Sequence, residues 1–281
     1  MTIVHDDELL AILRDDCPYS DITTEGLGIG DVAATLRMAA RQDMVLCGVE
    51  EAVRMFALMG ASAKAASASG AAVAAQGLIL EAAGEARALH RTYKMAQTWM
   101  EILSGIATAT RAIVTAAHRG NPHCRIACTR KHMPGMKRMA IRAIEAGGAA
   151  PHRLGLSDYL LVFNEHRVLL DDAVALKDHL ARLKRSAPER RLTAEAHGVD
   201  EALLLAKAGA DVLQVDKLSP EDVAELRAKL SAVALGVVLA AAGGVNASNA
   251  QAYAAAGADI LVTSAPYYAP PRDVKVTFAK G

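Results

Sequence analysis

The sequence predicts an α/β protein in which a mixed N-terminal layer is followed by a parallel sheet of about six βα units. Beyond the first hundred or so residues, short apolar runs alternate with helical segments of roughly 10–15 residues, a pattern typical of parallel sheets. The residues before them lack this alternation. In addition, Ala208-Gly209-Ala210-Asp211 recurs as Ala256-Gly257-Ala258-Asp259, and each segment has the form of a helix-capping glycine leading into a strand.

The N-terminal elements are predicted from local apolar patterns. Gly105 lies within a long helical pattern, where a glycine lowers stability, and this indicates close packing at that position. The predictions are helices over Glu8–Arg14, Val49–Leu58 and His90–Arg119, a strand carrying Leu36, Met38 and Ala40, a strand over Met44–Cys47, and two short strands within Ala61–Leu80.

The C-terminal elements are predicted from the alternation itself. Strands are expected over Arg125–Thr129, Tyr159–Phe163, Leu192–Ala196, Asp211–Asp216, Gly236–Ala241 and Asp259–Ser264. Helices are expected over Lys137–Ala146, Asp171–Ser186, Val199–Ala208, Pro220–Ser231 and Ala247–Ala256. The tail from Pro270 to Phe278 is interpreted as a strand that leaves this repeat and rejoins the N-terminal layer.

Composition excludes several classes of protein. The 31 basic and 31 acidic residues balance, and only 4% of residues are aromatic, so a nucleic-acid partner or an anionic membrane is not expected. No run approaches the roughly 20 apolar residues of a membrane span, and the start MTIVHDDELL is unlike a secretory signal. The four cysteines show no metal-ligand spacing. We therefore expect a cytoplasmic protein with reduced thiols.

Cations gather near the ends of the first predicted strands. Arg130 and Lys131 follow the first strand, Lys137 and Arg138 come next, and His152-Arg153 precede the second. Loops after parallel strands converge at one end of the sheet, and such cations suit carboxylates or phosphates. A solvated loop with surface ion pairs is the alternative interpretation.

The later strand ends carry acidic groups and glycines. Glu195 and Asp216 suit ribose hydroxyls or a divalent cation, or else form salt bridges with loop cations. Gly243-Gly244 precede a helix start and suit a phosphate, although glycine pairs are common in turns. His166, after the second strand, is assigned a structural or substrate-orienting role in preference to proton transfer.

Ordered motifs along the chain resemble those of the quinolinate phosphoribosyltransferase family. They are Asp21-Ile22-Thr23-Thr24, Ser104-Gly105-Ile106-Ala107-Thr108, Thr129-Arg130-Lys131 with Pro134-Gly135, Gly147-Gly148, His152-Arg153-Leu154-Gly155-Leu156-Ser157-Asp158, Asp216 and Gly243-Gly244. The likeness covers essentially the whole chain. The runs Thr129–Gly135 and Leu161–Phe163 look most like the ModD-type branch, which is associated with molybdenum transport genes.

This resemblance implies an N-terminal α/β sandwich over residues 1–110, rejoined by the tail 270–281, and an open six-stranded α/β barrel of the type II phosphoribosyltransferase kind over residues 111–269. It further implies Mg²⁺ as cofactor, phosphoribosyl pyrophosphate and a carboxylate acceptor as substrates, and a homodimer or larger homo-oligomer with shared sites. The implied catalytic residues are Lys131, Glu195 and Asp216; Glu195 and Asp216 hold the metal through the donor; Lys94, Arg130, Lys131, His152, Arg153 and His166 bind substrate; and Gly243, Gly244 and Ser264 bind phosphate.

Several positions depart from the family pattern. The lysine of the family's Lys-Asp-Asn-His segment falls on Phe163, the first glutamate of Glu-Val-Glu on Thr193, and the asparagine after the fourth-strand aspartate on Lys217. Ala242 replaces the family's serine before the glycine pair. Lys94 replaces the arginine that, in the family, one subunit contributes to the active site of its partner. The acceptor side is therefore retained more fully than the donor side.

Three functions remain open at this point. The first is a phosphoribosyltransferase acting on a small aromatic or heterocyclic carboxylate. The second is a true quinolinate phosphoribosyltransferase of NAD biosynthesis. The third, suggested by Phe163, is a non-catalytic anion-binding protein linked to molybdate handling.

Overall fold

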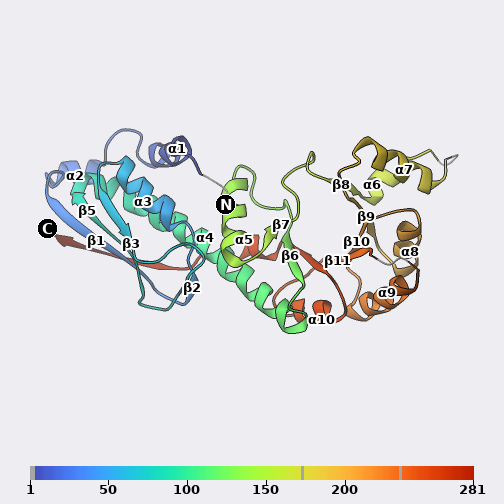
Figure 1. The fold of residues 1–281 in the computed structure, drawn as a ribbon. Coiled ribbons are helices and arrows are strands. Elements are labelled where there is room, and N and C mark those ends of the chain that lie inside the picture. Colours follow the sequence, from blue (N-terminus) through green and yellow to red (C-terminus); the bar gives the residue numbers. More distant parts are fainter. Residues whose placement is uncertain (1–3, 172–173, 234–235) are drawn as a thin grey trace. The chain divides into compact units, whose positions relative to one another are not determined.

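The computed structural model describes residues 4–171, 174–233 and 236–281, which form two compact units (Figure 1). The first unit contains the chain up to Arg111, together with His132–Gly148 and Pro266–Gly281. The second contains Ala112–Lys131 and Ala149–Ala265. The fold class is the predicted one, an antiparallel N-terminal sheet followed by an open parallel half-barrel.

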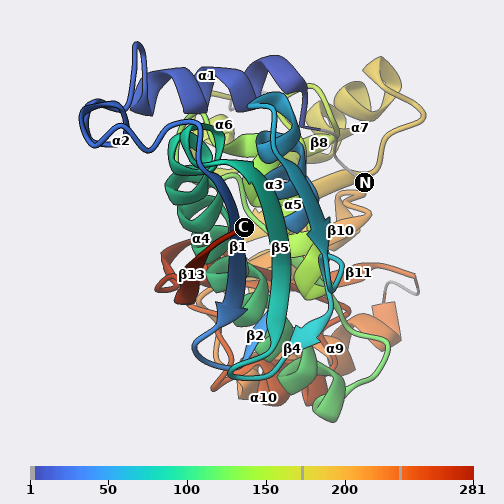
Figure 2. The same ribbon diagram turned by 90° about the vertical axis from the view of Figure 1, so that its left-hand side faces the viewer.

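The first unit is built on a four-stranded antiparallel sheet in the order β13-β1-β5-β3, with β1 and β5 side by side (Figure 2). In β1 the predicted side chains Leu36, Met38 and Ala40 are buried, as the two-residue period of a strand requires. The C-terminal strand β13 pairs with β1 along its length. These strands are β1 (Ala33–Ala40), β3 (Ser62–Ala65), β5 (Leu78–Glu85) and β13 (Val274–Lys280), and a separate pair is formed by β2 (Met44–Val45) and β4 (Ala72–Val73).

Helix α3 (Val49–Leu58) packs against this sheet and has the predicted bounds. Helix α2 (Ile22–Gly26) was not predicted; the Asp21 carboxylate caps it by accepting the N–H groups of Thr23 and Thr24. The close packing predicted at Gly105 is confirmed, because a Cβ there would lie 2.4 Å from the Pro270 carbonyl oxygen. The other helices are α1 (Asp6–Asp16), α4 (Ala86–Gly120), which runs from the first unit into the second, and α5 (Lys137–Gly147).

The second unit contains a seven-stranded parallel sheet in the order β7-β6-β12-β11-β10-β9-β8. Its first and last strands, β7 and β8, are consecutive in the chain but not paired, so the barrel is open between them. Small side chains of neighbouring strands, among them Ala127, Ala240 and Val262, pack together on one face. The strands are β6 (Arg125–Cys128), β7 (Ala150–Pro151), β8 (Leu160–Val162), β9 (Leu192–Ala196), β10 (Val212–Asp216), β11 (Val238–Ala242) and β12 (Ile260–Thr263).

The prediction of six strands was one too few, because β7 was missed. His152-Arg153 therefore follow a strand of their own. Helix α7 (Leu176–Ser186) begins later than the predicted Asp171, and residues 172–173 of that prediction lie outside the described chain. The remaining helices are α6 (Asn164–Arg167), α8 (Val199–Lys207), α9 (Pro220–Val233), α10 (Ala250–Ala255), shorter than predicted, and the 3₁₀ turn η1 (Ala265–Tyr268). No helix among the described residues is both long and apolar enough to cross a membrane.

The two Ala-Gly-Ala-Asp segments perform the same task at the amino ends of their strands. Asp211 accepts the N–H of Leu192, at the start of β9, and pairs with Lys184 at 2.7 Å. Asp259 accepts the N–H of Leu239 in β11 and pairs with Arg227 at 2.5 Å. Each aspartate thus ties its own strand to the start of a neighbouring strand.

Candidate active site

The candidate site residues of the second unit lie where its parallel strands end. Because all seven strands run in one direction, their carboxyl ends share one edge of the sheet, and loops that follow these ends meet there. The strand order places the end of β12 beside that of β6, and the end of β10 between those of β9 and β11. We call this edge the rim.

A hydroxyl pair links the ends of β6 and β12. Thr129 Oγ1 and Ser264 Oγ are 2.6 Å apart, and Thr129 Oγ1 also accepts the N–H of Lys131 at 3.2 Å. The Thr129 N–H donates to the Thr263 carbonyl, which continues the pairing of the two strands. This brings the predicted phosphate residue Ser264 beside the loop that carries Arg130 and Lys131.

His152 is held neutral at the end of β7. The backbone N–H of His152 donates to the Cys128 carbonyl at 2.7 Å, and its side-chain Nε2 lies 2.7 Å from the hydroxyl of Tyr159. Burial, aided by the charge of Arg153, lowers the pKa of His152 from 6.5 to about 4. At neutral pH this imidazole therefore acts as a hydrogen-bonding group and carries no charge.

Arg153 lies over an aromatic platform. Its guanidinium carbon is 5.6 Å from the centre of the Phe163 ring, which stacks on His166 with 5.8 Å between ring centres. The Phe163 N–H donates to Nδ1 of His166 at 3.0 Å, so His166 caps α6 as well as supporting the ring. Burial first, and then the charge of Arg130, lowers the pKa of Arg153. Two cations are thus close together here, and neither forms an ion pair with a carboxylate of the described residues.

Acidic groups meet at the ends of β9 and β10. Glu195 Oε2 accepts a hydrogen bond from the amide nitrogen of Gln214 at 2.9 Å. His197 lies 3.6 Å from Glu195 Oε1 and 4.0 Å from Asp216 Oδ2. Burial raises the pKa of Glu195, and the neighbouring charge of Asp216 contributes further. The two carboxylates form no ion pair with a lysine or arginine in the part of the chain that the structure describes.

Gly243 packs directly against this acidic group. A Cβ at Gly243 would lie 2.5 Å from Asp216 Oδ1 and 2.6 Å from the Lys217 nitrogen, and both Gly243 and Gly244 have positive φ angles. The predicted helix start after them is wrong. Asn246 and Ser248 belong to a turn whose N–H groups are already bonded to side-chain oxygens, at 2.8 Å each. A phosphate here would depend on the glycine pair alone.

Two predicted cations lie in the first unit. Arg138 Nη1 pairs there with Glu8 at 2.8 Å. Lys94 also lies in the first unit, where its Nζ donates to Gln97 at 2.9 Å and lies 5.4 Å from the centre of the Tyr93 ring.

Three further residues that contact the candidate site residues escaped the sequence analysis. His197 comes directly after β9, Tyr159 directly before β8, and Gln214 alternates with Asp216 along β10. Their positions relative to strand ends were the available signal. The Oε1 atom of Gln214 is buried without a hydrogen-bond partner in the described chain, which is notable beside two carboxylates.

Two family models match consecutive parts of the chain. The C-terminal domain of quinolinate phosphoribosyl transferase matches residues 106–277, and its N-terminal domain matches residues 21–104. A protein of Rhodobacter capsulatus named "Putative pyrophosphorylase ModD" is 45% identical over 89% of this chain and 96% of its own. A protein of the same name from Pasteurella multocida is 34% identical over 100% of this chain and 99% of its own.

Solved structures share the fold at low identity. NadC from Streptococcus pyogenes superposes with a TM-score of 0.90 at 23% identity, with both chains covered completely. The nicotinate-nucleotide pyrophosphorylase from Francisella tularensis gives a TM-score of 0.89 at 23% identity and covers 99% of this chain and 98% of its own.

Proposed function

Because the chain belongs to the quinolinate phosphoribosyltransferase family, we propose that it transfers ribose 5-phosphate from phosphoribosyl pyrophosphate to a small aromatic or heterocyclic carboxylate, with release of pyrophosphate. One observation carries this proposal. Among the described residues of the rim, Arg130 and Arg153 form no ion pair with a carboxylate, although the charge of Asp158 acts on Arg153, and Glu195 and Asp216 have His197 nearby but no lysine or arginine pair. A negatively charged acceptor and a metal-bound donor would supply the missing charges.

The acidic pair suits Mg²⁺ bound together with a substrate. Mg²⁺ commonly takes one or two protein carboxylates and completes its octahedron with phosphate oxygens and water. No group of three or more His, Cys, Asp or Glu residues in the described chain could hold a metal ion, so a metal would depend on these two carboxylates and the donor. Burial is the main cause of the raised pKa of Glu195, and the charge of Asp216 adds a repulsion that a cation would relieve. Bound there, Mg²⁺ would neutralise the leaving pyrophosphate.

The protein's own groups would act by positioning and by charge. Arg130 and Arg153 would hold the acceptor carboxylate, and the neutral His152, fixed by Tyr159, would accept or donate a hydrogen bond without adding repulsion. The carboxylates of Glu195 and Asp216 would stabilise the positive charge that develops on the ribosyl carbon. Lys131, on the same loop as Arg130, would bind the phosphates of the donor.

The experiment that tests this function is pyrophosphate release from phosphoribosyl pyrophosphate and Mg²⁺ with a panel of aromatic and heterocyclic acids. We expect release with at least one carboxylate and none with the matching amide. If a folded preparation releases no pyrophosphate with any acid of the panel, the proposal is contradicted. Calorimetry with molybdate on the same preparation tests the anion-binding alternative.

Quinolinate is a second candidate acceptor, because two neighbouring cations match a diacid. The difference from the family pattern lies at Phe163, where a lysine cation is replaced by a ring under Arg153. If quinolinate is the substrate, the gene should restore growth of a strain that lacks de novo nicotinate nucleotide synthesis. Growth at normal expression would establish quinolinate as the acceptor. If the strain does not grow, the acceptor is a different carboxylate.

We also propose that Lys94 completes the site of a second copy, as the family pattern implies for this position. Its ammonium group is exposed enough to reach a neighbour and is held by a single hydrogen bond to Gln97. Mixing inactive Lys94→Ala and Glu195→Gln proteins should restore part of the activity, because mixed dimers contain one intact site. No recovery after subunit exchange would contradict shared sites.

A further inference from the structure

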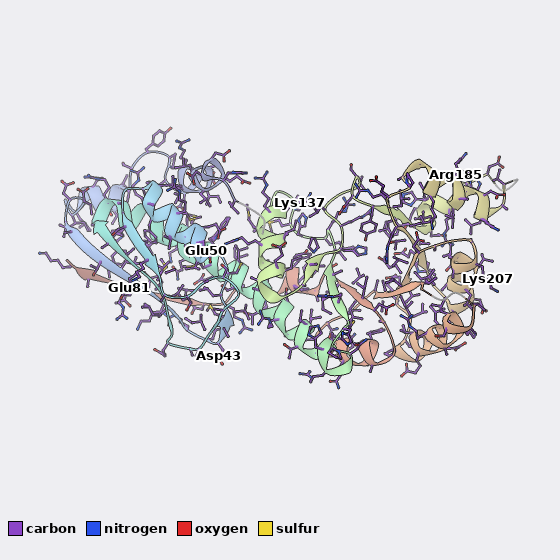
Figure 3. All side chains as sticks on the ribbon, in the orientation of Figure 1. Asp43, Glu50, Glu81, Lys137, Arg185 and Lys207 are labelled. Carbon is purple, nitrogen blue, oxygen red and sulfur yellow. The ribbon has the colours of Figure 1, made fainter. Side chains whose placement is uncertain are left out.

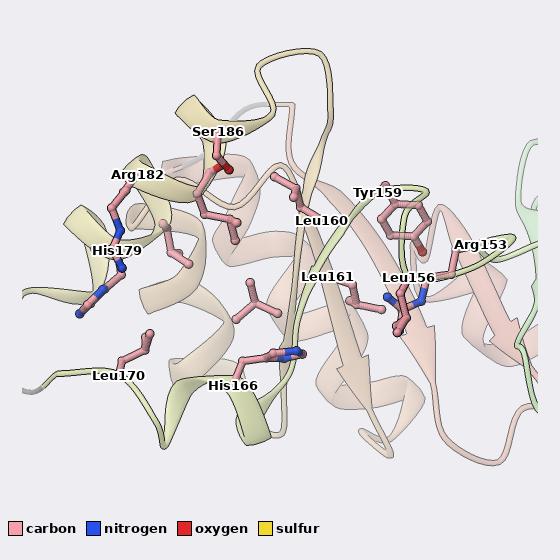
Figure 4. A pocket seen from close by; sticks show the side chains of 13 residues that line it. Arg153, Leu156, Tyr159, Leu160, Leu161, His166, Leu170, His179, Arg182 and Ser186 are labelled. Carbon is pink, nitrogen blue, oxygen red and sulfur yellow. The ribbon is translucent and has the colours of Figure 1, made fainter.

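A cavity of about 700 Å³ lies around strand β8, at the open side of the barrel (Figure 4). Leu160, Leu161 and Val162 all line it. Successive strand residues point to opposite faces, so the cavity reaches both faces of the sheet around the edge of β8 that has no neighbouring strand. We call it the seam cavity.

Its walls are apolar, and its charges have one sign. Besides the strand residues, leucines of α7 and of the loops on either side of β8 line it. Its described ionisable groups are Arg153, Tyr159, His166, His179 and Arg182, and no carboxylate is among the lining residues that the structure describes. The volume is several times the roughly 150 Å³ that holds a benzene molecule. It falls within the range of about 300–1,000 Å³ typical of small-molecule sites.

One face of α7 supplies the outer wall. Arg182, Leu183 and Ser186 stand three, four and seven positions after His179, and so share a face of the helix with it. His179 Nε2 lies 3.2 Å from the Asp171 carbonyl, which must accept the proton, while its Nδ1 is buried with no hydrogen-bond partner among the described residues. Arg182 forms no ion pair with a described carboxylate. The cavity therefore holds an unused polar atom and an unmatched cation beside an apolar surface.

We propose that the seam cavity binds an aromatic carboxylate of two or three rings, with its rings against the leucines and its carboxylate at Arg182. Charge complementarity selects an anion, and the apolar walls select a bulky hydrophobic body. Arg182 and His179 lie outside the set of residues assigned to the transferase reaction. Arg153, Tyr159 and His166 line the cavity and also belong to the proposed transferase site, so the test follows Arg182, which is not shared.

The test is calorimetric titration of the whole protein with 2-naphthoate, in the absence of phosphoribosyl pyrophosphate. We expect binding that is weaker by about tenfold or more in Arg182→Gln, because a hydrogen bond to a charged group is lost. Arg185→Gln is the matched control: Arg185 is on the same helix (Figure 3) but does not line the cavity, and its affinity should not change. Leu183→Trp should also weaken binding by filling the space, with circular dichroism to verify folding.

Two ligand controls separate charge from size. The neutral 2-naphthamide should bind more weakly than naphthoate and should be insensitive to Arg182→Gln, because the two changes remove the same contact. Benzoate should bind more weakly by on the order of tenfold, because it buries less apolar area.

Three results would overturn the proposal. They are an absence of naphthoate binding to the wild-type protein, equal binding by Arg182→Gln and the wild type, and a loss in Arg130→Gln that Arg182→Gln does not show. The last result would place the naphthoate at the rim. Pyrophosphate release is measured separately, so neither outcome decides the other.

Discussion

Two groups of charged residues in this molecule differ in whether their side chains have ion-pair partners. In the first unit, Arg142 on α5 is only 5% exposed and pairs with Glu51 at 2.6 Å and with Glu50 at 2.8 Å. Glu50, at the start of α3 (Figure 3), also accepts the N–H and hydroxyl of Ser69. At the rim of the second unit, Arg130 lies near Arg153 and Glu195 near Asp216, and none of the four forms an arginine–carboxylate or lysine–carboxylate pair among the described residues.

We interpret the charges of the first unit as holding the fold, and those of the rim as the charges that would bind a ligand under the proposed function. A buried ion costs several kcal/mol to desolvate, and a fixed counter-ion offsets that cost. Like charges held together raise the energy of the empty site, and a bound ion of opposite sign then lowers it. Substitutions in the first unit should therefore lower mainly stability, and substitutions at the rim should lower mainly activity.

The largest effect is expected in the first unit. Arg142→Ala leaves Glu51 buried without its cation, and we expect a loss of about 3–5 kcal/mol in the free energy of unfolding, measured by urea denaturation. The matched control is Arg54→Ala, which breaks the half-exposed pair with Asp6 and should lower the free energy of unfolding far less, because water already solvates both charges. Similar losses of unfolding free energy in both variants would show that the buried ion pairs of Arg142 stabilise the fold no more than the half-exposed pair of Arg54.

At the rim, a substitution should lower activity strongly and change stability little. Asp216→Asn keeps the shape against Gly243 but removes a carboxylate, and we expect kcat to fall by about 100- to 1,000-fold. Its unfolding free energy should stay level or rise slightly, because Glu195 loses a repulsive neighbour. For the same reason the pKa of Glu195, which burial and Asp216 raise, should fall when followed by carboxyl NMR. A destabilised, active Asp216→Asn would contradict the assignment.

The glycine pair offers a smaller test of how tightly the rim is packed. Gly244→Ala meets nothing within 4 Å, so only its positive φ angle matters, at about 1–2 kcal/mol. Gly243→Ala must also displace the Asp216 carboxylate, and we expect a further loss of about 1–3 kcal/mol together with lost turnover. Thermal unfolding of the two variants side by side measures the difference. Equal losses would mean that Asp216 is not held by Gly243.

A last test concerns the pH dependence of stability. The pKa of His152 is lowered by burial and by Arg153, so the unfolded chain binds a proton that the folded chain refuses between pH 6.5 and about 4. Stability should be unaffected by this group above pH 6.5 and should fall as the pH drops through that window. Urea denaturation at several pH values checks this, and His152→Gln should flatten the slope. An unchanged slope would show that other groups dominate.

Much of the fold could be predicted because its signals are local. Val49–Leu58 and Leu192–Ala196 have the predicted bounds, since a helical apolar face and a buried β run are each continuous in the sequence. Strand β7 could not be found in this way. It consists of Ala150 and Pro151, one of which lacks an N–H, and it exists only through its pairing with β6.

The site was predictable in part for a different reason. Strand ends in the sequence indicate which side chains reach the rim, and that rule identified Arg130, Glu195 and Asp216. It could not reveal that Phe163 would support Arg153, because that contact joins residues from two different loops. The contact of His197 with both carboxylates has the same origin, since it depends on the register of β9 and β10.

The aspartates Asp211 and Asp259 secure the strands from the end opposite the rim. The contacts that hold the barrel together therefore lie apart from the residues of the proposed active site. Loops at the carboxyl ends can exchange one chemistry for another while the scaffold stays intact, so redesign of the acceptor preference should begin there and leave both aspartates untouched.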